Sequence, residues 1–174
     1  LKFIPGKSQD LRAWFLAMQY WLGGTDENIE SMLRFLISRY SRVEGWRGCK
    51  TEMPKDYPDV GLYHPDSKGK IVDNIEDLPK LESPVGTIGI LLMRSYVLSG
   101  DTAHYDAVIK RFAEHNIQVV PAFSGGLDAR PAIEKYFKNS EKTVIDGLLS
   151  LTGFSLVGGP AYTDSEAAVS VLRE

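Results

Sequence analysis

The feature that most constrains this chain is an apolar run over residues 87–93, with the sequence TIGILLM. A strand in a parallel sheet is covered on both faces, so it reads as a nearly continuous apolar run. A second run of this kind, IQVVPAF, occupies residues 117–123, and a third candidate strand lies within residues 144–151. The chain is therefore expected to form an α/β domain around a parallel sheet.

A helix is expected between the first two runs, because apolar side chains recur there on one helical face. The residues at this spacing are Tyr105, Val108, Ile109 and Phe112. Asp101 is placed to cap the helix at its N-terminus. Strand, helix and strand together form a βαβ unit, whose crossover should be right-handed. We predict a Rossmann-like or periplasmic-binding-protein-like sheet.

Glycine-containing turns are expected after the three strands, at residues 99–101, 124–126 and 152–154. Ligands of open parallel sheets bind beyond the carboxyl ends of the strands, and glycine lets a ligand approach the backbone amides. We predict a ligand-binding site from these turns and their neighbours: Arg94, Ser95, His104, Ser124, Gly125, Gly126, Asp128, Gly153 and Phe154. The alternative is that the turns are only tight connections and that Arg94 and His104 are ordinary surface residues.

The first 40 residues predict a helical hairpin. Large apolar side chains share one face of its first helix: Leu11, Trp14, Phe15, Met18 and Leu22. Gly23 and Gly24 end this helix, and Thr25 caps a second helix with an apolar stripe of its own. We expect Trp14, Phe15, Met18 and Trp21 to pack in a core. Docking of the hairpin onto another domain or subunit is the alternative.

The chain divides by its periodicity into a hairpin at residues 1–40, a linker at 41–84 and an α/β domain at 85–174. The linker is rich in proline and glycine, which predicts an interdomain connection or a functional loop. A short strand is expected in it within residues 60–65. The last helix, which Asp164 can cap, looks like one that a further strand would follow, so a piece of a longer protein is expected.

Composition excludes several classes of protein. The 174 residues carry a formal net charge of −3, with 43% hydrophobic and 25% charged residues, as in ordinary soluble domains. A nucleic-acid binder normally has a basic face, and no run approaches the roughly 20 apolar residues of a membrane span. We therefore predict no nucleic-acid partner and no membrane span. The single cysteine, Cys49, excludes an internal disulfide and fits a cytoplasmic protein.

Motifs for nucleotide, metal and hydrolase sites are incomplete. Residues 5–8, PGKS, resemble the end of a phosphate-binding P-loop, but Leu1 stands where the motif needs its first glycine. The histidines, His64, His104 and His115, are not at paired metal-ligand spacing. Neither G-x-G-x-x-G nor G-x-S-x-G occurs. The motifs therefore predict no resident metal and no dinucleotide cofactor.

Several stretches together resemble one known family. They are SGD and HY within residues 99–105, VVPAFSGGLD at 119–128 and LSLTGFSLVGGPA at 149–161, with weaker matches in residues 2–9, 20–24 and 61–65. By these stretches the chain is similar to the family of large, porphyrin-binding subunits of magnesium chelatases, and its hairpin is closer to the bacteriochlorophyll branch than to the plant branch. The run LTGFSLVGGPA is the most specific part.

The resemblance implies that the parent protein binds protoporphyrin IX and inserts Mg²⁺, in an ATP-dependent step of bacteriochlorophyll or chlorophyll biosynthesis. ATP would be used by two partner subunits, I and D, of the AAA+ type. The protein would work in the cytoplasm of a photosynthetic bacterium, or in the plastid of a plant or alga. Because family members are several times longer, this chain would be a fragment, inactive without the remainder of its own polypeptide.

Other functions stay open beside this resemblance. One is the related cobalt-inserting subunit of cobalamin synthesis, and another is a non-catalytic ligand-binding or scaffold domain. The resemblance does not identify catalytic residues here. The nearest carboxylates, Asp101, Asp128 and Glu134, are explained by helix capping or solvent exposure, so we expect the base and the Mg²⁺ ligands elsewhere in the parent protein.

Overall fold

The computed structural model describes residues 7–139, 142–159 and 162–173. The chain forms two compact units. Residues up to Tyr57, with Leu98–Gly100, make the helical unit, and Pro58–Val97 with the residues from Asp101 onward make the α/β unit. The beginning of the P-loop-like segment, Pro5 and Gly6, lies outside the described residues, as do Pro160 and Ala161 of the most specific family run.

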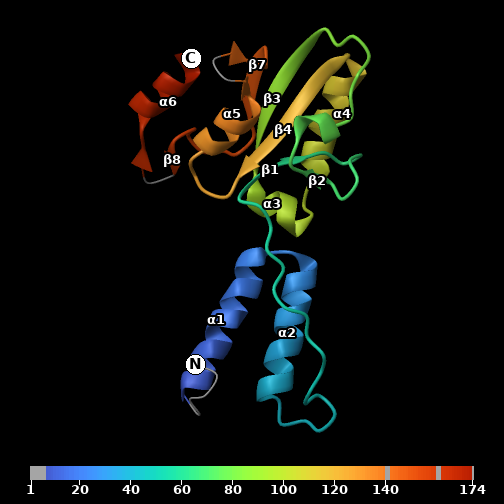
Figure 1. Ribbon diagram of the computed structural model, residues 1–174, viewed down its shortest axis with the longest axis vertical. Coiled ribbons are helices and arrows are strands. Elements are labelled where there is room, and N and C mark those ends of the chain that lie inside the picture. Colours follow the sequence, from blue (N-terminus) through green and yellow to red (C-terminus); the bar gives the residue numbers. More distant parts are fainter. Residues whose placement is uncertain (1–6, 140–141, 160–161, 174) are drawn as a thin grey trace. The chain divides into compact units, whose positions relative to one another are not determined.

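The helical unit is built on two antiparallel helices, α1 (Lys7–Gly23) and α2 (Asp26–Tyr40) (Figure 1). Gly24 lies between them with a left-handed φ of +64°. Thr25 caps α2, because its Oγ1 accepts a hydrogen bond from the Asn28 amide at 3.3 Å. Both predicted helices are present, and the second begins at the predicted cap.

The chain that follows α2 is fastened back onto the hairpin by two buried side chains. The Asn28 amide group donates to the Lys55 carbonyl and accepts from the Lys55 N–H, both at 2.9 Å. The Tyr20 hydroxyl donates to the Glu52 carbonyl. Asn28 and Tyr20 are each 1% exposed, so these bonds satisfy polar groups that water does not reach. The first part of the predicted linker is therefore fixed within the helical unit.

α1 does not turn its large apolar side chains toward α2. Its buried side chains are Ala13 and Tyr20. The larger ones are turned away: Trp14 is 56% exposed, Phe15 52% and Trp21 61%, while Met18 is half-buried. The prediction that Trp14, Phe15 and Trp21 pack in a core is wrong within this unit. Helical spacing shows which side chains share a face, but not which face meets the neighbouring helix.

The α/β unit contains a five-stranded sheet in the order β2-β1-β4-β3-β7. Its strands are β1 (Val60–Tyr63), β2 (Ile71–Val72), β3 (Gly86–Met93), β4 (Ile117–Ser124) and β7 (Gly147–Ser150). β3 is parallel to both neighbours, with Ile88 opposite Val119 of β4 and Gly147 of β7. β1 pairs antiparallel with β4, and β2 pairs antiparallel with β1. The predicted α/β fold is confirmed, with a sheet that is parallel from β4 to β7 and antiparallel at its β1 and β2 edge. β1 is the short strand expected within residues 60–65.

The remaining elements are short apart from the crossover helix between β3 and β4. They are η1 (Ile75–Asp77), α3 (Arg94–Ser99), α4 (Ala103–Glu114), α5 (Arg130–Tyr136), β5 (Lys138–Asn139), β6 (Lys142–Thr143), β8 (Gly158–Gly159), β9 (Tyr162–Thr163) and α6 (Ser165–Arg173). β5 pairs with β6 and β8 with β9, each antiparallel. In the described part of the chain, no helix has the length and apolarity needed to cross a membrane.

Helices cover both faces of the sheet (Figure 1). Ile109 of α4 clusters with Ile90 of β3 on one face, and Ile133 of α5 clusters with Leu91 of β3 on the other. Consecutive residues of a strand point to opposite faces, so the neighbours Ile90 and Leu91 place α4 and α5 on opposite sides. This double burial explains why β3 is apolar along nearly its whole length.

The turn at residues 99–101 does not follow β3 directly, contrary to the prediction. α3 begins at Arg94, immediately after β3, and Gly100 follows it with a left-handed φ of +75°. Six residues are too few to show a helical period, so the sequence gives no signal for this helix. The N-cap of α4 is Thr102 rather than the predicted Asp101. Only two of the expected glycine turns, 124–126 and 152–154, lie beyond sheet strands.

Tyr63 joins β1 to the beginning of α4. Its hydroxyl donates to Asp106 Oδ1 at 2.6 Å and lies 2.8 Å from Thr102 Oγ1. The side chain is 1% exposed. Burial, and next the bond to the Asp106 carboxylate, raise the pKa of Tyr63 to about 12. The neutral phenol is therefore the form that the fold stabilises.

Replacing Tyr63 by phenylalanine is expected to lower the free energy of unfolding by about 1–2 kcal/mol at pH 8, because the hydroxyl contacts with Asp106 and Thr102 are lost. A pKa raised on folding stabilises the protein below the unfolded value of 10.0, and this contribution disappears as the pH rises toward 12. The difference in stability between the parent chain and Tyr63→Phe should therefore shrink from pH 10 upward. Urea unfolding at a series of pH values measures it.

Tyr162→Phe is the matched control, because Tyr162 is 68% exposed. It should leave the stability unchanged at every pH. A difference between the parent chain and Tyr63→Phe that stays constant from pH 8 to pH 12 would contradict the raised pKa.

Candidate functional site

A pocket opens at the carboxyl ends of β3 and β4, beside the loop that follows β7. Its lining residues are Leu91, Leu92, Met93, Ser124, Gly126, Leu127, Ala129, Thr152, Phe154, Ser155 and Leu156. In the sheet, β4 lies on one side of β3, and β7, which comes later in the chain, lies on the other side of β3. The direction in which strands are added to the sheet therefore switches at β3. Ligands of open α/β sheets bind at such switch points. This pocket, called the switch-point pocket below, is therefore the candidate site.

The switch-point pocket is narrow. The space in it that water can occupy is about 20 Å³, which is room for roughly one molecule. A larger groove of about 700 Å³ lies at the amino ends of β3 and β4, where Thr87, Gln118 and Val144 contribute to its lining; we call it the amino-end groove. The switch-point pocket alone can hold only an edge or a substituent of a large ligand.

Backbone contacts hold the walls of the pocket in place. The Ala129 amide donates to the Leu156 carbonyl at 2.9 Å, which joins the turn after β4 to the loop after β7. Thr152 Oγ1 accepts from the Phe154 amide at 3.2 Å and so fixes the turn around Gly153, whose φ is +74°. Glycine is favoured there because other residues rarely adopt this conformation.

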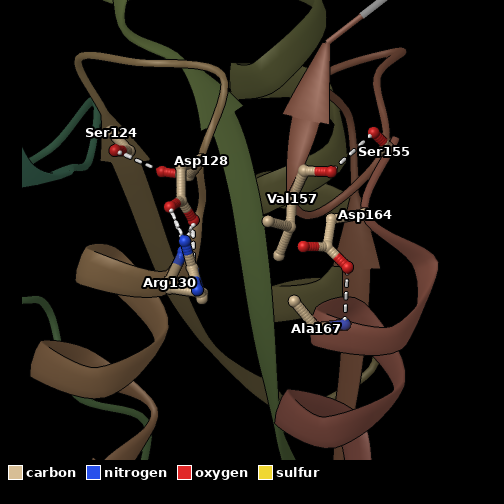
Figure 2. A network of polar contacts seen from close by, with 7 residues as sticks. All are labelled: Ser124, Asp128, Arg130, Ser155, Val157, Asp164 and Ala167. Carbon is tan, nitrogen blue, oxygen red and sulfur yellow. Dashed lines mark hydrogen bonds and ion pairs between the residues drawn. The ribbon is translucent and has the colours of Figure 1, made fainter. Parts of the chain in front are cut away.

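An ion pair braces the turn after β4 (Figure 2). The Asp128 carboxylate accepts from the Arg130 guanidinium, with Nε 3.0 and 2.9 Å from its two oxygens and a terminal nitrogen 2.6 Å from Oδ2. Ser124 Oγ donates to the Asp128 carbonyl at 2.9 Å. The hydrogen bonds from Arg130 hold the pKa of Asp128 below its usual value. Asp128 is therefore an ionised, engaged group and a poor general base.

The loop after β7 is closed by the cap of α6 (Figure 2). Ser155 Oγ donates to the Val157 carbonyl at 3.2 Å, and the Asp164 amide donates to the same carbonyl at 3.1 Å. Asp164 Oδ1 accepts from the Ala167 amide at 2.9 Å, so the predicted cap of the last helix is confirmed. The pocket is thus supported on one side by α5 and on the other by α6.

Arg94 is engaged next to the pocket. Its Nε donates to the Pro58 carbonyl at 2.8 Å, and its guanidinium lies 3.8 Å from Asp59 Oδ1. Gly125 lies against the same aspartate: a Cβ there would be 2.9 Å from Asp59 Oδ1 and 3.2 Å from its carbonyl oxygen. These contacts hold the start of β1 against the end of β4. A further role of Arg94 in ligand binding stays a prediction.

Ser95 and His104 lie outside the lining of the switch-point pocket. Ser95 is exposed on α3. The ring of His104, exposed on α4, is centred 3.9 Å from that of Tyr105 and 5.4 Å from that of Tyr96. Tyr105 accepts a hydrogen bond from the Met93 amide at 3.1 Å. His104 is therefore linked to the pocket only through its neighbour.

The structure gathers part of the predicted site. Ser124, Gly126 and Phe154 line the pocket, while Gly125, Asp128 and Gly153 lie in the turns that carry it. Their roles in binding stay predictions. The sequence analysis missed the apolar lining residues, of which Leu127 has a visible signal: it is a large apolar residue directly after a glycine turn and is 45% exposed. The sequence did not indicate a role for Asp59, because its contact with Gly125 depends on the pairing of β1 with β4, which are far apart in the chain.

Metal ligands are not gathered here. Among the described residues, no group of three or more histidine, cysteine, aspartate or glutamate side chains is arranged to hold a metal ion. The acidic residue of the pocket region, Asp128, is occupied by Arg130. The arrangement suits contact with an apolar ligand through backbone, Leu127 and Phe154, rather than metal chemistry.

Comparison with known proteins gives a consistent result. The family described as CobN/Magnesium Chelatase matches residues 18–173. The chain is 61% identical over 173 residues to the H subunit of magnesium chelatase from Rhodobacter capsulatus and 57% identical to that of Cereibacter sphaeroides. It is 34% identical over 188 residues to the chloroplastic magnesium-chelatase subunit ChlH of Oryza sativa subsp. indica.

These alignments cover 99–100% of this chain but only 14% of each relative. The chain thus spans about one seventh of the length of the curated relatives that it matches. Among solved structures, the catalytic subunit of cobaltochelatase from Mycobacterium tuberculosis aligns with a TM-score of 0.45 at 18% identity, over 66% of this chain and 8% of that one.

Gly125→Ala is expected to lower the free energy of unfolding by about 1–2 kcal/mol, because the new methyl group would lie 2.9 Å from Asp59 Oδ1 and 3.2 Å from the Asp59 carbonyl oxygen, so that Asp59 must shift at the start of β1. Gly126→Ala is the matched control, since its Cβ would meet no atom nearer than the Asp128 amide nitrogen at 3.7 Å. Urea unfolding of both variants measures the difference. Equal stability of the two would show that the contact between Gly125 and Asp59 does not constrain the turn.

Proposed function

This chain belongs to the CobN/magnesium chelatase family, and from that premise we propose that it is a segment of the porphyrin-binding subunit of a magnesium chelatase. The parent subunit inserts Mg²⁺ into protoporphyrin IX, and both are substrates rather than resident cofactors. The observation that carries the proposal is the 61% identity to the H subunit of a magnesium chelatase over 99% of the chain.

The finer assignments follow from the same relatives and are proposals as well. The reaction consumes ATP, which two AAA+ partner subunits, I and D, hydrolyse. Identity is 61% and 57% to the two bacterial subunits and 34% to the chloroplastic one. We therefore assign the parent protein to bacteriochlorophyll biosynthesis, in the cytoplasm of a photosynthetic bacterium.

Within the parent subunit, the segment contributes an edge of the porphyrin site. Leu127 and Phe154 offer apolar contact at the switch-point pocket, and the glycine turns let a flat ligand approach the backbone. The pocket is too small to enclose a macrocycle, so the remaining walls belong to other parts of the parent. Removal of the pyrrole protons needs a base, and the engaged Asp128 does not supply one, so this step also takes place elsewhere.

Segment exchange tests the assignment to magnesium chelatase. This chain replaces the matching region of the Rhodobacter capsulatus protein, and the chimera is assayed for Mg²⁺ insertion into protoporphyrin with ATP and the partner subunits. The chimera should retain activity within about tenfold of the native protein, a loss of roughly 1.4 kcal/mol. The matching segment of an uncharacterised Methanocaldococcus jannaschii protein, 27% identical to this chain, is the control and should not support insertion.

A chimera that folds and binds porphyrin but inserts no Mg²⁺, and that inserts Co²⁺ instead, would contradict the assignment and favour the cobalt-inserting relative. A folded chimera without either activity would contradict the assignment to a chelatase.

Porphyrin titration tests the place of the site within the segment. In the full-length subunit, Leu127→Asp should weaken deuteroporphyrin binding by about tenfold or more, because a charge is placed against an apolar ligand face. Val144→Asp is the matched control at the amino-end groove: Val144 is 40% exposed and Leu127 45%. The porphyrin absorbance band reports binding. Weakening by Val144→Asp alone would place the ligand at the other end of the sheet.

A further inference from the structure

The later part of α1 carries no charge. The chain has no lysine, arginine, aspartate or glutamate between Arg12 and Asp26. α2 differs, since it presents charged side chains such as the ion pair of Arg34 with Glu30 to solvent. A helix that is apolar nearly all round is normally buried within a larger protein. α2 covers one side of α1, so the other side needs a different neighbour.

Large apolar side chains form one continuous face on that other side. The face, called the uncharged face below, consists of Leu11, Trp14, Phe15, Trp21 and Leu22, which are 48%, 56%, 52%, 61% and 68% exposed. At 100° per residue these five span about 120° of the surface of α1: Leu11, Phe15 and Leu22 lie opposite the buried residues Ala13 and Tyr20, and Trp14 and Trp21 lie at about a right angle to them. The rings of Trp14 and Phe15 meet edge to face at 5.1 Å. Contiguous apolar surface of this kind marks an interaction site.

We infer that the uncharged face is a permanent interface, and that its occupant is another part of the same polypeptide, outside these 174 residues. This inference rests on the proposal that the chain is a segment of a longer subunit. Permanent interfaces resemble a domain core cut in half and are depleted of charge, whereas transient ones keep a more polar character. The uncharged face is depleted of charge in the way that permanent interfaces are.

The position of α1 in the family supports an occupant from the same chain. The family match begins at residue 18, within α1. The alignment with the Rhodobacter capsulatus protein extends further, over 173 residues, and so takes in the whole of α1. That alignment covers only 14% of the Rhodobacter capsulatus protein, so most of such a polypeptide lies outside this segment and is available to cover α1.

A membrane surface fits α1 less well. Helices that lie on membranes carry lysine and arginine along a polar face. The cations of α1 are Lys7 and Arg12, both in its first turns, and its opposite face is occupied by the contact with α2. The charge pattern therefore favours burial by protein.

Photo-cross-linking in the full-length parent subunit identifies the occupant. Trp14→p-benzoylphenylalanine places the probe in the uncharged face, and Arg34→p-benzoylphenylalanine on the solvent side of α2, where Arg34 is 57% exposed, is the control. The subunit is irradiated as a monomer without partner subunits. The expected product is an internal cross-link from position 14 to a peptide outside the region that this chain matches, and none from position 34.

Every other product overturns the inference. A band at twice the subunit mass means that a second copy covers the face. A cross-link that needs added partner subunits means a transient partner, and one to residues 58–173 means that the α/β unit covers it. Absence of any cross-link at position 14 means that the face stays in water.

Oxidative footprinting of the unsubstituted subunit covers the case in which the probe disturbs folding. Trp46, 51% exposed, is nearly as exposed in this chain as Trp14 and Trp21. In the full-length monomer, oxidation of Trp14 and Trp21 should be lost while Trp46 remains reactive; equal oxidation of all three contradicts the inference. Neither readout uses metal insertion, so failure here is distinct from failure of the segment exchange.

Discussion

β3 is hydrogen-bonded to a parallel strand on each side, and the arrangement of the α/β unit depends on this double pairing. It pairs with β4 along all eight of its residues and with β7 along four. A strand buried in this way must be apolar on both faces, which requires a helix on each side, and α4 and α5 provide them. The same pairing brings the carboxyl ends of three strands together, so the switch-point pocket follows from the position of β3.

The elements that the sequence predicted are those encoded by local patterns. The strands at 87–93 and 117–123 are apolar runs, and α4 follows from the spacing of Tyr105, Ile109 and Phe112. The features that it did not predict are of two kinds. Some depend on partners far away in the chain, and others contain too few residues to show a pattern. The pairing of β1 with β4 joins Val60 to Ser124, and α3 is too short for a period. The prediction that Trp14, Phe15 and Trp21 pack in a core was wrong, because α1 is apolar on both of its faces and the sequence pattern alone does not show which face meets α2.

The candidate site likewise combines features that the local sequence predicts with features that depend on distant partners. The turns around Gly125 and Gly153 were predictable, since glycine after a strand is a local signal. The ion pair of Asp128 with Arg130 is also local, with only one residue between them. Because this ion pair engages the Asp128 carboxylate, Asp128 is a poor general base. The contacts of Asp59 with Arg94 and Gly125 depend on the strand pairing and were not predictable. Sequence reasoning therefore located the pocket but could not separate residues that hold its walls from residues available to a ligand.

Two surfaces of the chain are incomplete for the same physical reason. In the function proposed above the ligand is a porphyrin, a broad, flat and largely apolar ring whose burial requires walls on both faces, whereas the switch-point pocket has room for roughly one water molecule. The uncharged face of α1 likewise leaves Trp14 and Trp21 more than half exposed. In each case apolar surface is presented without enough partner surface within the described residues. Because burial of such surface is the main favourable term in folding and association, both proposals assign the missing partner surface to protein beyond this segment, one to complete a ligand site and the other to complete a core.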